Sequence, residues 1–580
     1  MSFDVVASSR IEKVTYDPWR HVRTVGLQAG LLCVFLAAVG ILGLFNKRPI
    51  IVGELTLGYA VLGLAYLTAG ILVARQRLMR TNGGLLLGGL VAGLIAAAVV
   101  SLLALLLSLY NIRWIFVSLD PLLLKMLTFT FSAQVGIPLM LLTGAVLGAA
   151  GAGLMLLPDR LRLPVIGGLC GAGIAGLFQE MLRPVLANSS ITKPLHDIIY
   201  TWTGLTQNGA ITIFVIVALA IAAWQAVGGR VKAQYAELPS PTRRNLRWGY
   251  FALAAALFVL FPAFAGNFIG QVFLMVALFT LMGMGLNLEV GLAGLLDLGF
   301  VAFYAVGAYV TGLLTADSPF ALAHLSYWEA MPIAVLCSVL VGILFGIPVL
   351  KVRGDYLAVA TLGLGEIVRV IVLSDAAAPL LAGAKGILQI PRPQIGDFHF
   401  STPVSLFYLA LVASLIAAYC AWRLEDSRLG RAWKAIRDDE DVAQALGINL
   451  IQVKLLAYGL GAAFAGLAGS LFAVMLGSIY PHSFQLIISI NILALIIVGG
   501  MGSLPGVVVG AAVLIGLPEI LREFGEFRFL FYGIAIILVM RIKPEGLWPS
   551  AAKRRELQLD AETRAEQTAP HTSATVAQKV

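Results

Sequence analysis

Long, nearly unbroken apolar runs dominate this chain and set its predicted architecture. Runs long enough to cross a bilayer as helices begin near residue 25 and recur to about residue 541. A spanning helix needs about 20 apolar residues, because its backbone must satisfy its own hydrogen bonds in lipid. A transmembrane β-barrel would instead show short segments of alternating polarity. The pattern therefore predicts an all-α, polytopic transmembrane helical bundle of about sixteen spans.

The predicted spans form two groups on either side of a polar segment. The first group lies near 25–45, 50–74, 84–110, 135–157, 164–182 and 209–228. The second lies near 249–265, 267–287, 298–315, 329–350, 355–374, 405–422, 451–477, 485–500, 504–522 and 526–541. Between them, residues 229–248 carry five basic residues and two prolines, which is typical of a cytoplasmic linker.

These groups define the expected domains. We predict an N-terminal extra transmembrane region over 1–228, the linker over 229–248 and a second membrane domain over 249–545. Residues 546–580 lack apolar periodicity, and we expect them to form a disordered cytoplasmic tail.

Composition and charge support a membrane protein and argue against other classes. Of the residues, 59% are hydrophobic and 12% are charged, whereas soluble domains average about 25% charged residues. The net charge of +9 comes mainly from Lys and Arg in short loops, where they orient the chain. We therefore expect both termini to be cytoplasmic and no nucleic-acid partner. The four cysteines and six histidines have no ligand spacing, so neither a metal nor a cofactor is predicted.

Two glycine-rich stretches, 290–314 and 499–516, contain enough helix breakers to interrupt spans. Small residues three or four apart also allow close helix packing, and packing alone remains an alternative explanation for any single glycine. Interrupted helices occur at membrane depth only where they face protein or a water-filled cavity. We therefore expect broken or re-entrant segments beside a transport pathway.

Residues 423–450 form the clearest polar interruption of the second membrane domain. Ser427 can cap a helix with basic flanks and an apolar stripe made by Leu429, Trp433 and Ile436. Four consecutive acidic residues then favour the start of a second short helix, which Gly447 can end in a left-handed conformation. A solvated loop needs neither the stripe nor the glycine, so we interpret this segment as a compact element that binds a partner protein.

Four stretches resemble, in order, signatures of the branched-chain amino-acid permease family of ATP-binding-cassette importers, and its LivM-type subunit in particular. They are NLEVGLAGLLDLGFVAFYAVGAYV, RGDYLAVATLGLGEIVRVIV, SRLGRAWKAIRDDEDVAQALGINLIQVKLLAYGLGAAFAGLAGSLFA and LIIVGGMGSLPGVVVGAAVL. The resemblance covers about 265–545. It implies a multi-pass protein of the bacterial plasma (inner) membrane. It also implies four partners, namely two cytoplasmic ATPase subunits, a LivH-type permease subunit and an extracytoplasmic solute-binding protein.

In such importers the cytoplasmic element docks on the ATPase through a motif resembling Glu-Ala-Ala-x-x-x-Gly. Here Asp441, Val442 and Ala443 precede Gly447, so the match is imperfect. The residues that the resemblance assigns to ATPase coupling are Arg431, Trp433, Glu440, Asp441, Ala443 and Gly447.

Residues 351–372 combine spanning hydrophobicity with several charges. Arg353, Gly354, Asp355 and Tyr356 form an interfacial motif at the start of a span. Deeper in the same span, two opposite charges three residues apart can pair on one helix face.

These two residues, Glu366 and Arg369, allow two interpretations. They either brace the bundle or a dimer interface, or they line the pathway and complement the ammonium and carboxylate of an amino acid. Asp297, Tyr304 and Tyr309, close to a glycine-broken segment, are weaker pathway candidates.

The sequence contains no Gly-Lys dipeptide and hence no nucleotide phosphate loop of the G-x-x-x-x-G-K-[ST] type. The chain is therefore not expected to be an enzyme, and its partners must hydrolyse ATP. The resemblance favours branched-chain or other hydrophobic amino acids as substrates, with urea, amides or other amino acids as alternatives. A stand-alone ion-coupled secondary transporter that uses Glu54, Glu366 or Glu519 is the alternative from another class, although it would have no ATPase to dock.

Overall fold

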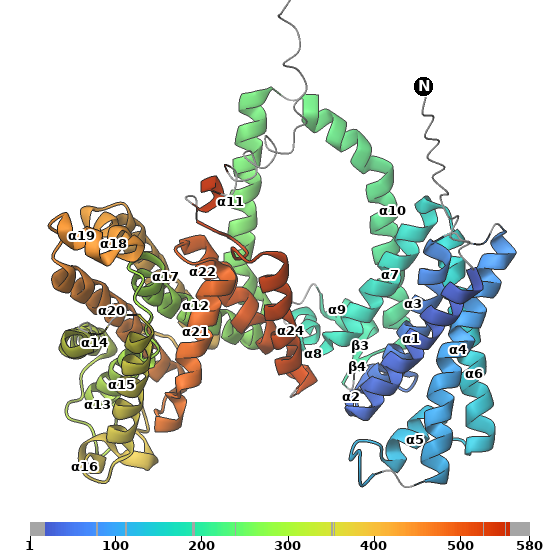
Figure 1. Ribbon diagram of the computed structural model, residues 1–580, viewed down its shortest axis with the longest axis horizontal. Coiled ribbons are helices and arrows are strands. Elements are labelled where there is room, and N and C mark those ends of the chain that lie inside the picture. The colour runs from blue at the N-terminus through green and yellow to red at the C-terminus, as the bar shows by residue number, and fades with distance from the viewer. Residues whose placement is uncertain are drawn as a thin grey trace, which may run out of the picture. The chain divides into compact units, whose positions relative to one another are not determined.

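The computed structural model describes residues 18–76, 79, 81–110, 113–187, 192–202, 204–237, 239–349, 352, 354–525, 527–550, 553–556 and 559. The chain divides into two compact units, Met1–Leu257 and Phe258–Val580 (Figure 1). Both are overwhelmingly helical in the described residues, which confirms the predicted all-α polytopic bundle.

The first unit contains most of the chain's N-terminal helices. They are α1 (Pro18–Ala38), α2 (Ile41–Asn46), α3 (Leu57–Arg75), α4 (Asn82–Leu109), α5 (Pro121–Leu127), α6 (Ala133–Leu156), α7 (Asp159–Leu177), α8 (Gln179–Ala187), α9 (Lys193–Ile199) and α10 (Gln207–Glu237). Helix α11 (Ser240–Ala265) begins in this unit and ends in the second. Glycines let α4 and α6 touch backbone to backbone: a Cβ on Gly148 would lie 2.8 Å from the Cα of Gly93.

A small sheet joins distant parts of the first unit. Its strands are β1 (Pro49–Ile51), β2 (Leu55–Thr56), β3 (Tyr200–Thr201) and β4 (Gly204–Leu205), in the order β2-β1-β4-β3. Strand β1 pairs antiparallel with β2 and parallel with β4, and β3 pairs antiparallel with β4. The predicted span at 50–74 is therefore helical only from Leu57 onward.

The second unit contains the remaining elements. Its helices are α12 (Asn267–Leu286), η1 (Asn287–Leu292), α13 (Val301–Thr315), α14 (Tyr327–Val349), α15 (Asp355–Leu373), α16 (Ala378–Leu381), η2 (Gly383–Lys385), α17 (Pro403–Glu425), α18 (Arg428–Asp438), α19 (Glu440–Ala445), α20 (Leu450–Leu476), η3 (Pro481–Ser483), α21 (Leu486–Gly499), α22 (Leu504–Ala511), η4 (Ala512–Gly516), α23 (Leu517–Ile520), η5 (Leu521–Phe524) and α24 (Phe527–Ile542). Strands β5 (Gln394–Ile395) and β6 (Phe398–His399) form a short hairpin.

Helix α20 is the central element of the second unit. It packs against α12, α13 and α14, and α18 is a further neighbour. Large side chains that are fully buried fill the spaces between these helices, among them Phe300, Phe303 and Tyr458. Small residues on α20 admit close neighbours: Gly466 contacts the backbone at Gly307 of α13.

Both glycine-rich stretches interrupt helices, as predicted. Helix α12 passes into the π-helical turn η1, and the chain then stays non-helical up to α13. Helix α21 ends at Gly500, whose φ is 119°, and Gly502, with a φ of 73°, precedes α22. Such positive φ angles are readily adopted by glycine and rarely by other residues.

Twelve helices in the described residues have the length and hydropathy of membrane spans. The other four predicted runs lie in α11 and in the shorter helices Val301–Thr315, Leu504–Ile520 and α24. The 15 residues of α13 rise only about 22 Å, against about 30 Å of hydrocarbon. The glycine-broken segments therefore account for part of the difference between about sixteen predicted spans and the twelve found.

Candidate functional site

Helices α18 and α19 form the two-helix element that the sequence predicts, which we call the coupling element (residues 427–447). Ser427 caps α18 by accepting a hydrogen bond from Gly430 N, with Oγ and N 3.2 Å apart. Asp439 starts α19 by accepting from the backbone N–H groups of Asp441 and Val442 at 2.9 and 3.0 Å. Gly447 follows α19 with a φ of 86°. Each boundary is therefore set by a local interaction that the sequence encodes.

Three of the residues assigned to coupling fix this element to α20. Trp433 is fully buried, and its Nε1 donates to Val453 O at 2.8 Å. Glu440 pairs with Lys454 at 2.6 Å, and Lys454 is only 4% exposed. Ala443 is buried beneath α19. Removing one partner of a buried ion pair costs about 3–5 kcal/mol, so the Glu440–Lys454 pair makes the attachment of the coupling element rigid.

The outer face of the coupling element carries a different set of residues, which are exposed. Arg431 and Asp441 are exposed, and Arg431 Nη1 donates to Asp426 O at 3.2 Å. Val442 and Leu446 are also exposed, at 55% and 77%. Sequence reasoning missed these two apolar residues, although their spacing of four within a short polar helix places them on one face. An exposed apolar pair rimmed by charges is typical of a protein-binding surface.

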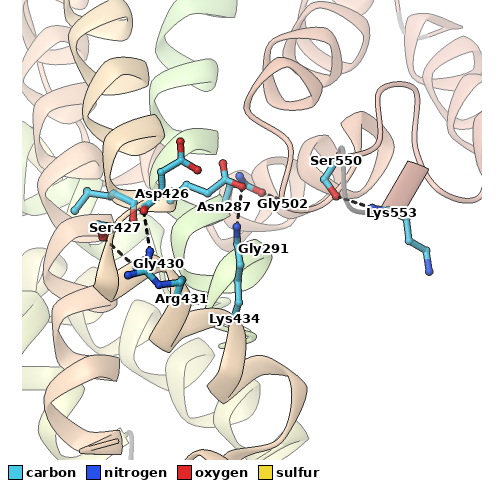
Figure 2. A network of polar contacts seen from close by, with 12 residues as sticks. Asn287, Gly291, Asp426, Ser427, Gly430, Arg431, Lys434, Gly502, Ser550 and Lys553 are labelled. Atoms are coloured by element: carbon cyan, nitrogen blue, oxygen red, sulfur yellow. Dashed lines mark hydrogen bonds and ion pairs between the residues drawn. The ribbon is translucent and has the colours of Figure 1, made fainter. Parts of the chain in front are cut away.

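A hydrogen-bonded junction links the coupling element to both helix breaks. Arg437 Nη1 donates to Gly291 O in η1 at 2.7 Å. Within the membrane unit, Asn287 Oδ1 accepts from Gly502 N at 2.9 Å. Figure 2 shows Asn287 and Gly502 beside the residues of α18. We call Asn287, Gly291, Arg437 and Gly502 the coupling junction, because they join α18, η1 and the α21–α22 break.

Two acidic residues lie buried next to the junction. Glu289 of η1 is 0% exposed, and neither of its carboxyl oxygens has a hydrogen-bond partner. Asp297 is 1% exposed and accepts from Gly299 N at 2.6 Å. The two carboxyl groups lie near each other and near Tyr458. Asp297 was singled out from the sequence, but Glu289 was missed, although a carboxylate inside an apolar run is itself a signal.

No ion pair reaches either carboxyl group from the residues that the structure describes. Two ionised carboxylates at this depth would repel each other without a compensating cation. Glu289 lies in the same π-helical turn as Gly291, whose carbonyl accepts from Arg437. A displacement of α18 would therefore act on the turn that carries Glu289.

The remaining candidates meet in part at a cleft on the side of α15. This narrow cleft, with a cavity volume of about 10 Å³, is lined by Tyr309, Arg369, Pro481 and Phe484 among others. Arg369 pairs with Glu366 at 2.8 Å, with side chains 33% and 38% exposed. The predicted pairing is therefore present.

Tyr304 and the interfacial motif lie elsewhere. Tyr304 is buried in an aromatic cluster, with ring centroids 5.2 Å from Phe472 and 5.5 Å from Phe484. Arg353, like the neighbouring Lys351, lies outside the described residues. Gly354 precedes α15 with a φ of 63°, Asp355 is its first residue, and Tyr356 is 78% exposed.

Comparison with known proteins bears on the second unit. A family profile described as "Branched-chain amino acid transport system / permease component" matches residues 268–540. The chain is 37% identical over 306 residues to the high-affinity branched-chain amino acid transport system permease protein LivM of Salmonella typhimurium, covering 49% of this chain and 70% of that one. The chain belongs to the branched-chain amino-acid transport permease family.

Other relatives support the same family assignment. LivM of Escherichia coli is 37% identical over 303 residues, which cover 70% of that protein. The permease protein LivH of Escherichia coli is 24% identical over 284 residues, covering 90% of that protein and 46% of the permease described here. No solved structure matches. Since the family profile begins at residue 268, the first unit lies outside it.

The contact of Glu289 with α20 gives a first prediction. A Cβ at Gly461 would overlap the Glu289 carboxyl group, with Cδ only 2.6 Å away. We expect Gly461→Ala to lower the stability of the purified permease by about 1–3 kcal/mol through overpacking, measured as its thermal unfolding midpoint in detergent. Gly459→Ala, whose Cβ would meet Ile343 at an ordinary 3.5 Å, is the control. Equal midpoints for the two variants would show that Glu289 does not occupy this space.

Proposed function

We propose that this permease is a transmembrane subunit of an ATP-binding-cassette importer and forms, with a second permease subunit, the pathway for branched-chain or other hydrophobic amino acids. Two cytoplasmic ATPase subunits hydrolyse ATP, and an extracytoplasmic binding protein delivers the substrate. Both termini and the coupling element face the cytoplasm of a cell whose inner membrane holds the complex. Family membership and the exposed apolar face of the coupling element support this proposal.

The coupling junction is the observation that carries the proposal. A lone carrier has no use for a rigidly held cytoplasmic element, whereas an ATP-driven permease must receive motion from outside the membrane. A push on α18 is transmitted through the Arg437 guanidinium to η1 and, through Asn287, to the α21–α22 break. Hydrogen bonds of a charged donor are roughly twice as strong as neutral ones, which suits this role.

The cleft beside α15 supports the proposed pathway. Its lining is mainly apolar, and Arg369 and Glu366 beside it complement a carboxylate and an ammonium group. Helix α15 also presents exposed apolar residues, including Val359 and Ile367 at 67% and 53%. We propose that the second permease subunit packs on this face and closes the cleft. In this arrangement Glu366 and Arg369 lie both at a subunit interface and beside the pathway, which combines the two earlier interpretations of the pair.

One observation favours a second candidate function. The buried pair Glu289 and Asp297 resembles the intramembrane acids with which ion-coupled carriers bind protons or cations. A stand-alone secondary transporter would use them without any ATPase. The energy source for uptake therefore separates the two candidates.

A transport assay tests the proposed function directly. Proteoliposomes holding the permease, its partner permease and the ATPase subunits should take up labelled leucine only with internal ATP and external binding protein. Unlabelled isoleucine and valine should compete, and urea should not, because it lacks the apolar side chain and both charges. Uptake by the permease alone on a proton gradient would favour the secondary transporter instead.

The exposed face of the coupling element gives a prediction about assembly. Leu446→Asp places a charge where an apolar partner surface should lie, and we expect at least a tenfold loss of ATPase-subunit association, measured by co-purification. Leu446→Met, which keeps an apolar side chain, is the control. Because Leu446 is 77% exposed, the permease itself should fold normally. Undiminished association of Leu446→Asp would exclude this face as the docking surface.

The junction gives a separate prediction about coupling. Arg437→Gln removes the charged donor to Gly291 O, a hydrogen bond worth about 1.5–3 kcal/mol, while the docking face stays unchanged. The variant should bind the ATPase subunits but lose uptake and substrate-stimulated ATP hydrolysis by at least tenfold. Arg428→Gln, at an exposed arginine of the same helix, should retain both. Full uptake by Arg437→Gln would mean that motion enters the membrane unit by another route.

A further inference from the structure

The first unit contains a pocket that neither the family relationship nor the proposed function explains. It lies between β2, α3, α5 and α6 and has a volume of about 400 Å³. Leu62, Met140 and Leu147 are among its apolar lining residues. Both α3 and α6 have the length and hydropathy of membrane spans, so we expect the apolar part of the pocket to lie at membrane depth.

One end of the pocket is polar and aromatic. Glu54 is the one charged residue among the described lining residues; it is exposed, and no hydrogen bond or ion pair with another described residue holds its carboxylate. The rings of Tyr59 and Phe129 stack beside it, with centroids 5.4 Å apart and planes 8° from parallel. A carboxylate next to aromatic faces is complementary to an ammonium group.

The chain maintains this end in a strained conformation. Phe129 and Thr130 have φ angles of 53° and 67°, in the left-handed region that residues other than glycine rarely adopt. Backbone hydrogen bonds hold the turn, from Phe129 N to Met126 O and from Thr130 N to Lys125 O at 3.0 and 2.7 Å. Tyr59 Oη donates to Met126 O at 3.0 Å, which fixes the other ring. Strained backbone that its surroundings hold in place is concentrated at ligand sites.

A second polar group lies deeper in the pocket. Tyr66 is 3% exposed, and its hydroxyl has no hydrogen-bond partner although it lines the pocket. Tyr59, Gly63 and Tyr66 lie on one stripe of α3, and the two tyrosines are about 10 Å apart along the axis. A buried hydroxyl without a partner is unfavourable, unless a ligand supplies an acceptor such as an ester carbonyl.

We propose that this pocket binds one membrane phospholipid with an amino head group. The order of groups fits such a lipid: Glu54 and the aromatic pair take the ammonium, Tyr66 donates to an ester carbonyl, and the apolar end holds an acyl chain. The pocket thereby gives the first unit a role as the permease's lipid-binding domain. This inference is independent of the proposed transport function, because it concerns only residues of the first unit.

Native mass spectrometry of the purified full chain tests the proposal. The chain in detergent is mixed with equal amounts of phosphatidylethanolamine and phosphatidylglycerol, and bound lipid is counted. We expect one retained phosphatidylethanolamine in strong preference to phosphatidylglycerol. Gly63→Leu, which fills the pocket toward Leu147, should reduce retention at least tenfold. Gly173→Leu is the matched control, since a Cβ at this exposed helical glycine of the same unit meets nothing within 4 Å.

Two conservative variants distinguish the loss of a lipid-binding site from a general loss of folding. Glu54→Gln should abolish the preference for phosphatidylethanolamine while keeping some lipid bound, and Tyr66→Phe should lower retention severalfold for both lipids. Equal retention of both lipids by the wild type would overturn the proposal, as would indistinguishable retention by Gly63→Leu and Gly173→Leu. Binding of a free long-chain amine with no retained phospholipid would also overturn it, because the occupant would then not come from the bilayer.

Discussion

The coupling junction is the constraint on which the second unit depends. Each break in a membrane helix leaves backbone N–H and C=O groups that lipid cannot satisfy. In this permease the two breaks satisfy part of that requirement for each other, because Asn287 of one accepts the N–H of Gly502 in the other. Arg437 supplies a donor to Gly291 O from α18. These hydrogen bonds satisfy backbone groups of the interrupted helices. They also connect the two breaks, so we expect a movement of one break to be transmitted to the other.

Glycine has two different structural functions in this chain. It brings helices together, as where Gly148 of α6 meets Gly93 of α4 in the first unit and Gly466 of α20 meets Gly307 of α13 in the second. At Gly500 and Gly502 it instead supplies positive φ angles where a helix stops. Close packing favours one arrangement of neighbouring helices, whereas a break allows the flanking helices to change direction. The broken helices lie in the part of the chain that the family profile matches.

Local features of the fold could be predicted from the sequence, whereas long-range contacts could not. Ser427 and Gly447 mark the ends of the coupling element because capping and left-handed stops depend on neighbouring residues. Trp433 was assigned to ATPase coupling, yet it is buried against α20, since amphipathicity cannot tell which partner covers an apolar stripe. Hydropathy predicts the number of spans only approximately, because it does not distinguish a short re-entrant helix from a spanning one. The pairing of Glu366 with Arg369 was predictable from spacing, but the cleft beside them depends on residues of other helices.

The absence of a side chain at Gly461 has an evolutionary consequence. The Glu289 carboxyl group occupies the space that a Cβ at position 461 would need, so a change at one position alters the cost of a change at the other. Alanine at 461 overpacks the contact while glutamate is present at 289, whereas a shorter residue at 289 leaves room for it. Related permeases should therefore carry alanine at 461 more often where the residue at 289 is short.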